Sequence, residues 1–477
     1  MTKTHDTYFL NADVALKYAL QQNRTVPLAD SGKGLQICYY NGKPVNNAPE
    51  NMIFVPLDKL FDYFINTKNR QPTLLSREGS QFSQKKIKEI EQYFEKVFTE
   101  VNEKRDQRRQ HYIELIKNQE PDFNDNPKRV FLMTSRHTTV IQYSTKGIAK
   151  AFDDLGYDTK ILIEEDDMQL LYKDLRVKEI YEFNPHITFN INHMFNDIVN
   201  EKTWNIVWWQ DPMEELMNDV PINVRERDIV FSFDPSFDAF WIKKQVTPVY
   251  RQYFCIDDKV FYPDSKIERK NKVVFIGSSY INFFKYAMIP ESFKQELISW
   301  LEKGKKFSEN DVKILGDKYS LSFEHYPVVG ILQGIVRDTT IQWLCEESDL
   351  EVEIYGRNWE EYEIVKPFFK GEVPHGKAVA DIYCSAKYAL SCQGSTIQSQ
   401  RLAEIAACGA FPVVYDSRPF SPDPLWEDQY LFFRTRNELK EALKKEPKMY
   451  KGTFERIKSK FSYECFAKQI DRMIPKR

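Results

Sequence analysis

Residues 130–163, VFLMTSRHTTVIQYSTKGIAKAFDDLGYDTKILI, carry the pattern that decides the fold of this chain. An apolar run at Val130–Thr134 predicts a strand, and the polar loop Ser135–Thr139 separates it from an amphipathic helix. Gly156 is suited to cap that helix, and Thr159–Ile163 predicts a second strand. A strand, a helix and a strand in this order form a βαβ unit, which implies a parallel sheet.

The same alternation continues along the chain as two series of elements. The first series continues with apolar runs that predict strands at His186–Asn190, Asn205–Trp209 and Asp228–Phe233. The second series predicts strands at Val273–Gly277, Glu351–Gly356, Tyr388–Ser391 and Phe411–Tyr415, with helices at about 290–348 and 398–408. Strands bounded by turn residues and alternating with helices are typical of parallel sheets wrapped by helices. We therefore predict an α/β fold with two Rossmann-like domains in tandem.

The N-terminal quarter differs from these two series. Residues 1–82 mix short apolar runs, Leu35–Tyr40 and Met52–Leu57, with turn-rich stretches, which predicts a small α/β region. From Gln84 to about Gln119 neither Pro nor Gly interrupts a helical spacing of apolar residues, so we predict one long amphipathic helix. Its run KRDQRR is interpreted as a solvated helical face, and the alternative is a surface that binds nucleic acid or another anion.

A chain of 477 residues exceeds what one hydrophobic core usually serves, so several units are expected. We expect a small accessory region at residues 1–82 and a helical connector at 83–125. Two Rossmann-like domains should follow at 126–262 and 263–452, and a closing helix at 453–477 should pack across both.

Charge and cysteine content narrow the class of protein. A net charge of −3, from 67 basic and 70 acidic residues, offers no general attraction to nucleic acid, so we expect no nucleic-acid partner. The seven cysteines are scattered without a CxxC pair, which predicts reduced, mostly buried thiols. The sequence has no signal-peptide pattern at its start and no apolar run of membrane-spanning length, so we expect a cytoplasmic protein without a transmembrane segment.

The strongest candidate site is LSCQGSTIQSQRLAEIAACG, Leu390–Gly409, in which a strand runs through a small polar loop into a helix. Helix N-termini at the carboxyl ends of parallel strands bind anions, and small residues let a phosphate approach the backbone. We expect this segment to bind a diphosphate and a ribose, with Arg401 adding charge and Glu404 accepting the ribose hydroxyls. The loop residues that would offer N–H and hydroxyl groups to the diphosphate are Gly394, Ser395, Thr396 and Ile397. The alternative is a capped helix with a surface Arg/Glu pair.

Further candidates lie at neighbouring strand ends. Gly277 and Gly356 each end a predicted strand, where chain and ligand meet in this architecture. Arg357 is either a diphosphate contact or a surface arginine. In the segment FKGEVP, Lys370 leads into a loop where Val373 and its neighbour would flank a nucleobase.

A general base is expected from the first Rossmann-like series. His137 follows the first strand, His193 follows HITFNIN, and Asp211 follows NIVWWQ, so all three occupy strand ends. Trp208 and Trp209 next to Asp211 would partly desolvate its carboxyl, or stack on a sugar, or simply belong to the core. His137 is alternatively a structural or capping histidine.

No metal site is expected. No DxD motif stands in a strand-end loop, and Asp166–Asp167 is interpreted as a solvated turn. A helix N-terminus and basic residues can stabilise a bound diphosphate without a metal, so we expect no metal and no tightly bound cofactor.

The motif order gives a family resemblance over about Val130–Ile474. FIG, IYGRNW, FKGEVP, a Tyr-containing helix before KYALS, and S-x5-R-x2-E-x2-A-x-G-x-F resemble the CgeB-like, spore-protein-like branch of the GT-B glycosyltransferases. The resemblance implies transfer of a hexosyl or related sugar from a nucleoside-diphosphate sugar to a glycan or protein hydroxyl, as in glycan biosynthesis or protein glycosylation. It also implies that residues 126–262 form the acceptor domain and residues 263–452 the nucleotide-sugar donor domain, with phosphate and ribose roles for Arg401 and Glu404. Thr396 stands where many retaining relatives carry a second Glu, so retention of configuration is not implied.

Two rival functions remain open at this point. A nucleotide-sugar epimerase on the same fold would act on the donor alone, and product analysis without acceptor would separate it from a transferase. A degenerate, non-catalytic transferase would serve as a binding or assembly protein, with homo-oligomers formed through the N-terminal region or the long helix.

Overall fold

A computed structural model describes most of the chain, with the N-terminal region described only in part. The described residues are 6–9, 36–40, 52–68, 74–77, 84–138, 140–166, 169–211, 213–287, 289–321, 328–394, 397, 399–418, 430–446 and 452–475. The chain divides into two compact units. One comprises Met1–Val207, Val224–Ile229 and Lys476–Arg477, and the other comprises Trp208–Asn223 and Val230–Pro475. The domain boundaries expected from the sequence stay predictions.

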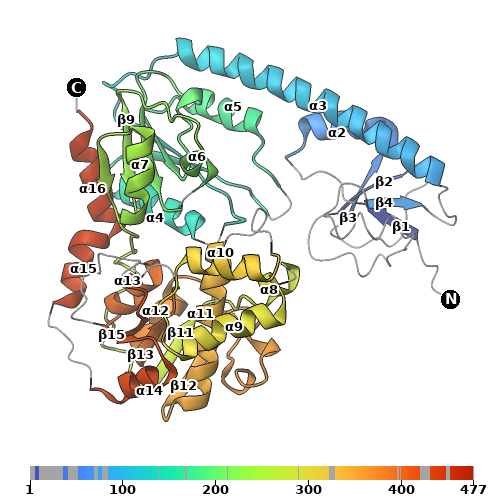
Figure 1. Cartoon of the computed structure of the whole chain (residues 1–477). Coiled ribbons are helices and arrows are strands. Elements are labelled where there is room, and N and C mark those ends of the chain that lie inside the picture. The colour runs from blue at the N-terminus through green and yellow to red at the C-terminus, as the bar shows by residue number, and fades with distance from the viewer. Residues whose placement is uncertain are drawn as a thin grey trace. The chain divides into compact units, whose positions relative to one another are not determined.

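The N-terminal region contains a four-stranded sheet and the long helix. The sheet order is β1 (Asp6–Phe9), β4 (Leu74–Arg77), β2 (Gln36–Tyr40), β3 (Met52–Pro56), with β1 antiparallel to β4 and the other pairs parallel. The turn η2 (Leu57–Lys59) and α2 (Leu60–Asn66) follow β3, and α3 (Gln84–Asn118) is one continuous helix, as predicted (Figure 1).

The basic run of α3 is a solvated face only in part, which corrects our expectation: Lys104 and Gln107 are exposed, whereas the three arginines contact other elements. Arg105 is 6% exposed, and its Nη1 lies 3.8 Å from Oδ1 of Asp174, while Nη2 of Arg108 lies 2.7 Å from Oδ2 of the same carboxylate. Arg109 pairs with Asp197 at 3.0 Å. The reason is that α5 (Lys173–Phe183) packs along α3 and presents Asp174 to it (Figure 1).

A six-stranded sheet forms from the first predicted series. Its order is β10 (Val249–Arg251), β9 (Asp228–Ser232), β8 (Trp204–Trp209), β7 (Ile187–Ile191), β5 (Arg129–Met133), β6 (Asp158–Leu162). β5 pairs parallel with both β6 and β7, and α4 (Ile141–Asp154) connects β5 to β6, so the βαβ unit is confirmed. The remaining short elements are η3 (Asn196–Ile198), α6 (Glu214–Met217), η4 (Pro235–Phe237) and α7 (Asp238–Lys244).

A five-stranded sheet, parallel throughout, forms from the second series. Its order is β12 (Glu351–Tyr355), β11 (Lys270–Ile276), β13 (Ala386–Ser391), β14 (Phe411–Tyr415), β15 (Leu431–Phe433). The helices of this part are α8 (Ile281–Tyr286), α9 (Glu291–Glu302), α10 (Glu309–Lys318), α11 (Val328–Glu347), α12 (Lys377–Ser385), α13 (Gln400–Ala407) and α14 (Arg436–Lys444), with the turns η5 (Trp359–Glu361) and η6 (Lys366–Phe368). The predicted α/β class with two Rossmann-like sheets is confirmed.

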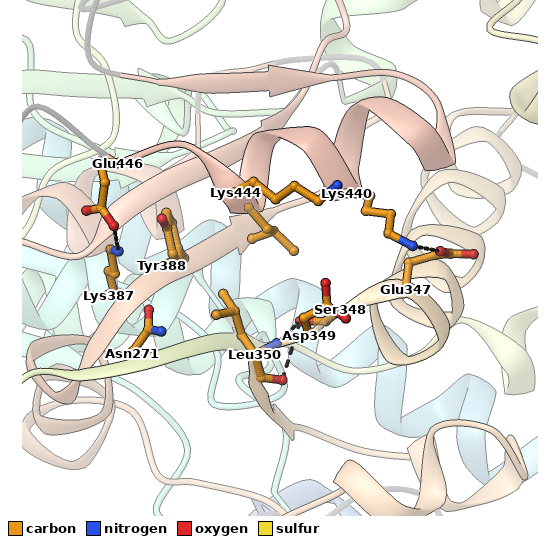
Figure 2. Close-up of a pocket in the computed structure, with 11 residues that line it drawn as sticks. Asn271, Glu347, Ser348, Asp349, Leu350, Lys387, Tyr388, Lys440, Lys444 and Glu446 are labelled. Carbon is orange, nitrogen blue, oxygen red and sulfur yellow. Dashed lines mark hydrogen bonds and ion pairs between the residues drawn. The ribbon is translucent and has the colours of Figure 1, made fainter.

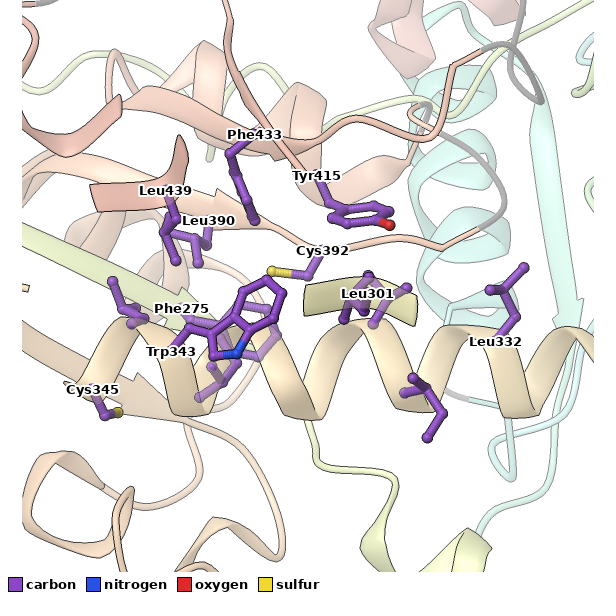
Figure 3. Packing of buried hydrophobic residues seen from close by; sticks show 14 of the residues in the cluster. Phe275, Leu301, Leu332, Trp343, Cys345, Leu390, Cys392, Tyr415, Phe433 and Leu439 are labelled. Carbon is purple, nitrogen blue, oxygen red and sulfur yellow. The ribbon is translucent and has the colours of Figure 1, made fainter. Parts of the chain in front are cut away.

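Both faces of the five-stranded sheet are buried, because side chains alternate along each strand. On β11, Val273 and Phe275 join the core under α9, α11 and α14, whereas Val274 joins the core under α12 and α13. Figure 3 shows the first of these cores, where Phe275 and Trp343 pack with residues of the neighbouring strands. The consequence is a rigid sheet whose strand ends are fixed from both sides.

The C-terminal segment is two helices rather than the single helix expected from the sequence. α15 (Thr453–Phe461) and α16 (Tyr463–Met473) are separated at Ser462, whose hydroxyl accepts the N–H of Cys465 and caps α16. The backbone of Ile256 bonds to the chain on both sides of Ser462. Its N–H donates to the carbonyl of Phe461 at 2.7 Å, and its carbonyl accepts the N–H of Tyr463 at 3.1 Å, so these two groups are not available to continue one helix.

Candidate functional site

Two glycines meet at the carboxyl edge of the five-stranded sheet. Gly356 follows β12 with φ +129°, and a Cβ there would lie 2.3 Å from the carbonyl oxygen of Gly277 at the end of β11. A Cβ on Gly277 would lie 2.6 Å from Nη2 of Arg401. Glycine is therefore required at Gly356, where the neighbour is backbone, and at Gly277 it leaves room for the guanidinium in the position observed.

Arg401 is delivered to this edge by the first turn of α13. The helix is capped by Ser399, whose hydroxyl accepts the N–H of Leu402 at 3.2 Å. The guanidinium carbon lies 5.1 Å from the ring centre of Phe275, which supports it by a cation–π contact. Its Nη1 is buried and has no hydrogen-bond partner among the residues that the structure describes. Gly277, Gly356 and Arg401, all predicted from the sequence, are thus brought together.

Arg337 on α11 was not anticipated from the sequence. Its Nη1 donates to the carbonyl of Ser278 at 3.1 Å, and its guanidinium carbon lies 4.8 Å from the ring centre of Tyr280. Burial, and next the charge of Arg401, lower the pKa of Arg337. The signal that points to it is a charged pair, Arg337–Asp338, in the middle of an apolar helix.

Asp338 holds the loop that follows β11. Its carboxylate accepts the hydroxyl of Ser279 at 2.8 Å, the backbone N–H of Tyr280 at 3.0 Å and the hydroxyl of Tyr362 at 2.9 Å. Burial raises the pKa of Asp338 to about 6, against the opposing effect of these donors and of Arg337. The buried carboxylate of Asp338 therefore fixes the position of the loop that follows β11.

Glu404 lies one turn along α13 from Arg401 and is only 4% exposed. Its Oε1 accepts from Nε2 of His375 at 2.9 Å and from the amide of Gln400 at 2.8 Å. His375 comes from the loop after FKGEVP, and a lone histidine in a loop gave no sequence signal for this contact. Both contacts fix the orientation of the carboxylate.

The loop predicted to bind the diphosphate is only partly described. The N–H of Gly394 donates to Oε1 of Gln333 at 2.8 Å, and a Cβ at Gly394 would lie 2.9 Å from the carbonyl oxygen of Leu332. This glycine therefore serves the close approach of α11, and its N–H is bonded within the protein. Ile397 is 1% exposed and belongs to the core. Ser395 and Thr396 lie outside the described residues.

The remaining donor candidates lie near the same edge with more exposure. Arg357 is exposed, and its Nε donates to Glu372 at 2.7 Å, which matches the surface-arginine alternative. Lys370 is exposed, and its N–H pairs with the carbonyl of Ile354 at the end of β12. Val373 is half-buried against the core beneath α12 and α13.

The three candidate bases differ in their surroundings. His137 follows β5, and its Nε2 lies 3.3 Å from the carbonyl oxygen of Gln169. His193 follows β7 and packs on Phe195 at 5.0 Å between ring centres. Asp211 follows β8 in the other compact unit and is exposed, whereas Trp208 and Trp209 are fully buried. The two indoles are core residues, so they neither desolvate Asp211 nor offer a stacking face.

Among the described residues no group of three or more His, Cys, Asp or Glu side chains is placed to hold a metal ion. The six cysteines whose side chains are described are free thiols, five of them buried. No helix in the described part of the chain is long and apolar enough to cross a membrane.

A pocket of about 250 Å³ lies at the opposite, amino edge of the five-stranded sheet (Figure 2). Asn271 and Lys387, the second residues of β11 and β13, contribute to its lining. Its lysines are neutralised, since Lys387 pairs with Glu446 at 2.8 Å and Lys440 with Glu347 at 3.0 Å. This pocket is therefore not part of the candidate site: its charges are paired, and it lies at the edge of the sheet opposite to Arg337 and Arg401.

The parallel sheet with helices on both faces defines a Rossmann-like domain, and its carboxyl edge is the edge where such domains bind ligands. Residues 337–471 match the family model described as glycosyl transferase-like, a stretch that begins at Arg337 and includes Arg401 and Glu404. The match supports the glycosyltransferase class for this part of the chain.

No curated protein matches the sequence. Similar solved structures include sucrose-phosphate synthase from Thermosynechococcus elongatus, with 10% identity, a TM-score of 0.47, and coverage of 72% of this chain and 98% of that chain. A glycosyltransferase from Rickettsia africae shows 8% identity and a TM-score of 0.43 over 73% and 98% of the two chains. HepE of Anabaena, solved with UDP-glucose, shows 9% identity and a TM-score of 0.43 over 72% and 98%.

Proposed function

We propose that this chain is a glycosyltransferase of the GT-B type that transfers a sugar from a nucleoside-diphosphate sugar to a hydroxyl of a glycan or protein. The observation that carries the proposal is the position of Arg401, whose Nη2 lies beside Gly277 at the carboxyl edge of a parallel sheet. Its Nη1 is buried without a hydrogen-bond partner among the described residues. Guanidinium groups at such an edge recognise phosphate oxygens. The order of motifs supports a place in the CgeB-like branch.

In the proposed reaction, the bond between the anomeric carbon and the diphosphate oxygen breaks as the acceptor oxygen bonds to that carbon. The electron pair of the broken bond stays on the diphosphate, where Arg401 and the N-terminal turn of α13 stabilise the added charge. The acceptor hydroxyl loses its proton to a base, for which His137, His193 and Asp211 remain our candidates. No step of this scheme requires a metal ion.

Glu404 is proposed to bind the ribose. Its contacts to His375 and Gln400 both use Oε1, so Oε2 is the oxygen that we assign to the ribose hydroxyls. A buried carboxylate that is already oriented loses little entropy when it accepts a further hydrogen bond. Lys370 and Val373, at the adjoining strand end, are the proposed neighbours of the nucleobase.

Calorimetry of donor binding tests this assignment. The Glu404→Ala variant should bind a nucleoside-diphosphate sugar at least about tenfold more weakly, because a charge-assisted hydrogen bond is lost. Glu441→Ala, which removes an exposed carboxylate from α14, is the matched control and should bind with wild-type affinity. Equal donor affinity of wild type and Glu404→Ala would remove Glu404 from the site.

Product analysis distinguishes the transferase from an epimerase. Without acceptor, a transferase should slowly release free sugar and nucleoside diphosphate, whereas an epimerase would return an altered sugar nucleotide. Absence of nucleotide binding altogether would favour a non-catalytic assembly protein.

A further inference from the structure

Arg337 is a buried cation whose polar atoms are not all satisfied. It is 9% exposed at the middle of α11, and its Nε is buried without a hydrogen-bond partner among the described residues. The carboxylate next to it in sequence, Asp338, is engaged by Ser279, Tyr280 and Tyr362 instead of forming an ion pair with it. An incompletely paired, buried guanidinium is costly and needs a reason.

Two guanidinium groups converge on one turn of the chain. Nη1 of Arg337 bonds to the carbonyl of Ser278, and Nη2 of Arg401 lies beside Gly277, the preceding residue. The groups are near enough for the charge of Arg401 to lower the pKa of Arg337, after the larger effect of burial. Each retains one buried nitrogen without a partner in the described part of the chain. Like charges held this way repel one another until an anion neutralises both.

We propose that Arg337 is a second phosphate-binding cation of the donor site and that it makes the site prefer two linked phosphates over one. This assignment rests on the proposed function, since it places the diphosphate of the donor between Arg337 and Arg401. One guanidinium would contact each phosphate. A nucleoside monophosphate would satisfy only one of the two cations and leave the other buried and unpaired.

Inorganic pyrophosphate tests the proposal without knowledge of the nucleobase. Calorimetry of the full chain should show that pyrophosphate binds more tightly than orthophosphate at equal ionic strength. Arg337→Gln should weaken pyrophosphate binding by about tenfold or more, because charge-assisted hydrogen bonds are lost, while orthophosphate binding at Arg401 changes less than about threefold. Arg436→Gln is the matched control, since it removes one arginine from α14, where Arg436 pairs with Glu347, and should leave both affinities unchanged.

Arg337→Lys guards against a folding defect in Arg337→Gln. Lysine keeps the charge but lacks the planar fork, so it should lose part of the preference for pyrophosphate. If Arg337→Gln does not fold, the lysine variant decides the outcome. Pyrophosphate affinity unchanged in the variant that folds, or an equal loss for both anions, overturns the proposal.

The failure of the proposed function is distinguishable from the failure of this inference. If the chain binds pyrophosphate through Arg337 but transfers no sugar, the transferase is refuted and the two-cation site stands. If the chain transfers sugar while Arg337→Gln binds pyrophosphate like wild type, the transferase stands and the two-cation site is refuted.

Discussion

At Asp338, burial and the surrounding hydrogen-bond donors shift the pKa of the carboxyl in opposite directions. Its pKa rises from 3.8 to about 6 because burial outweighs the donors around it. The folded chain therefore binds more protons than the unfolded chain between these two values, and stability falls as pH rises through this window. Above pH 6 the full cost, about 3 kcal/mol, is present.

Asp338→Asn should remove this pH dependence, since an amide does not titrate while it still accepts a hydrogen bond. We expect the melting temperature of wild type, relative to that of the variant, to fall between pH 5 and pH 7.5. Thermal unfolding of both proteins at the two values measures it. A constant difference between the two proteins would show that Asp338 does not titrate in this range.

At this scale, the sequence predicts residues with a local signature and misses those assembled by packing. Gly277, Gly356 and Arg401 mark strand ends and a helix start, and the structure brings them together. Arg337 lies within an apolar helix that reads as core, so its place beside Arg401 follows only from how α11 packs under the sheet. His375 is 29 residues from Glu404 in the sequence, and only the folded chain brings the two side chains into contact.

Among the elements, α3 is held to α5 by a buried ion pair. Asp174 has 2% of its side chain exposed and faces Arg105, which has 8% exposed. The pattern of α3 predicts its length but not its partner, because the same KRDQRR run fits either solvent or a carboxylate on another helix.

Asp174→Ala should destabilise the unit that contains α3 by about 3–5 kcal/mol, because the buried charge of Arg105 loses its carboxylate and keeps only hydrogen bonds to the carbonyls of Phe64 and Thr67. Glu182→Ala, which removes an exposed carboxylate from α5, the helix that also carries Asp174, should lower the free energy of unfolding by less than about 1 kcal/mol. Urea unfolding followed by circular dichroism compares the two variants. A loss no larger for Asp174→Ala than for Glu182→Ala would refute the anchoring role.

The junction of β11 and β12 yields another prediction. Gly356→Ala should lower the melting temperature and weaken donor binding, because the new Cβ collides with the carbonyl of Gly277. Gly156→Ala, at φ +87° with open space around it, is the control and should lower only the melting temperature, and by less. Thermal shift and calorimetry measure both effects. Unchanged donor affinity in a folded Gly356→Ala protein would place the ligand elsewhere.

Longer elements were predictable, and short ones were not. β14 spans the predicted residues Phe411–Tyr415 because both of its faces are apolar. β10 and β15 have three residues each and exist only through pairing with β9 and β14, which no local pattern reveals. Ser462 likewise interrupts the closing helix through contacts with Ile256, which is remote in sequence.

For the whole molecule, the two series of strands were sufficient to predict two parallel sheets, because buried parallel strands are recognisable as apolar runs. The candidate site residues concentrate at one edge of the second sheet, where glycines, cations and a buried carboxylate meet. The acceptor remains outside what local patterns encode, since histidines and an aspartate at strand ends occur in many α/β proteins.

A thermal-shift measurement against a panel of nucleoside-diphosphate sugars tests the central claim most directly. Ligand at about 100 times its Kd should add about 2.7 kcal/mol to stability, so at least one nucleoside-diphosphate sugar should raise the wild-type melting temperature. Arg401→Gln should abolish that increase while it retains the fold. The account is contradicted if no nucleotide sugar stabilises the wild-type chain, or if the same ligand stabilises Arg401→Gln equally.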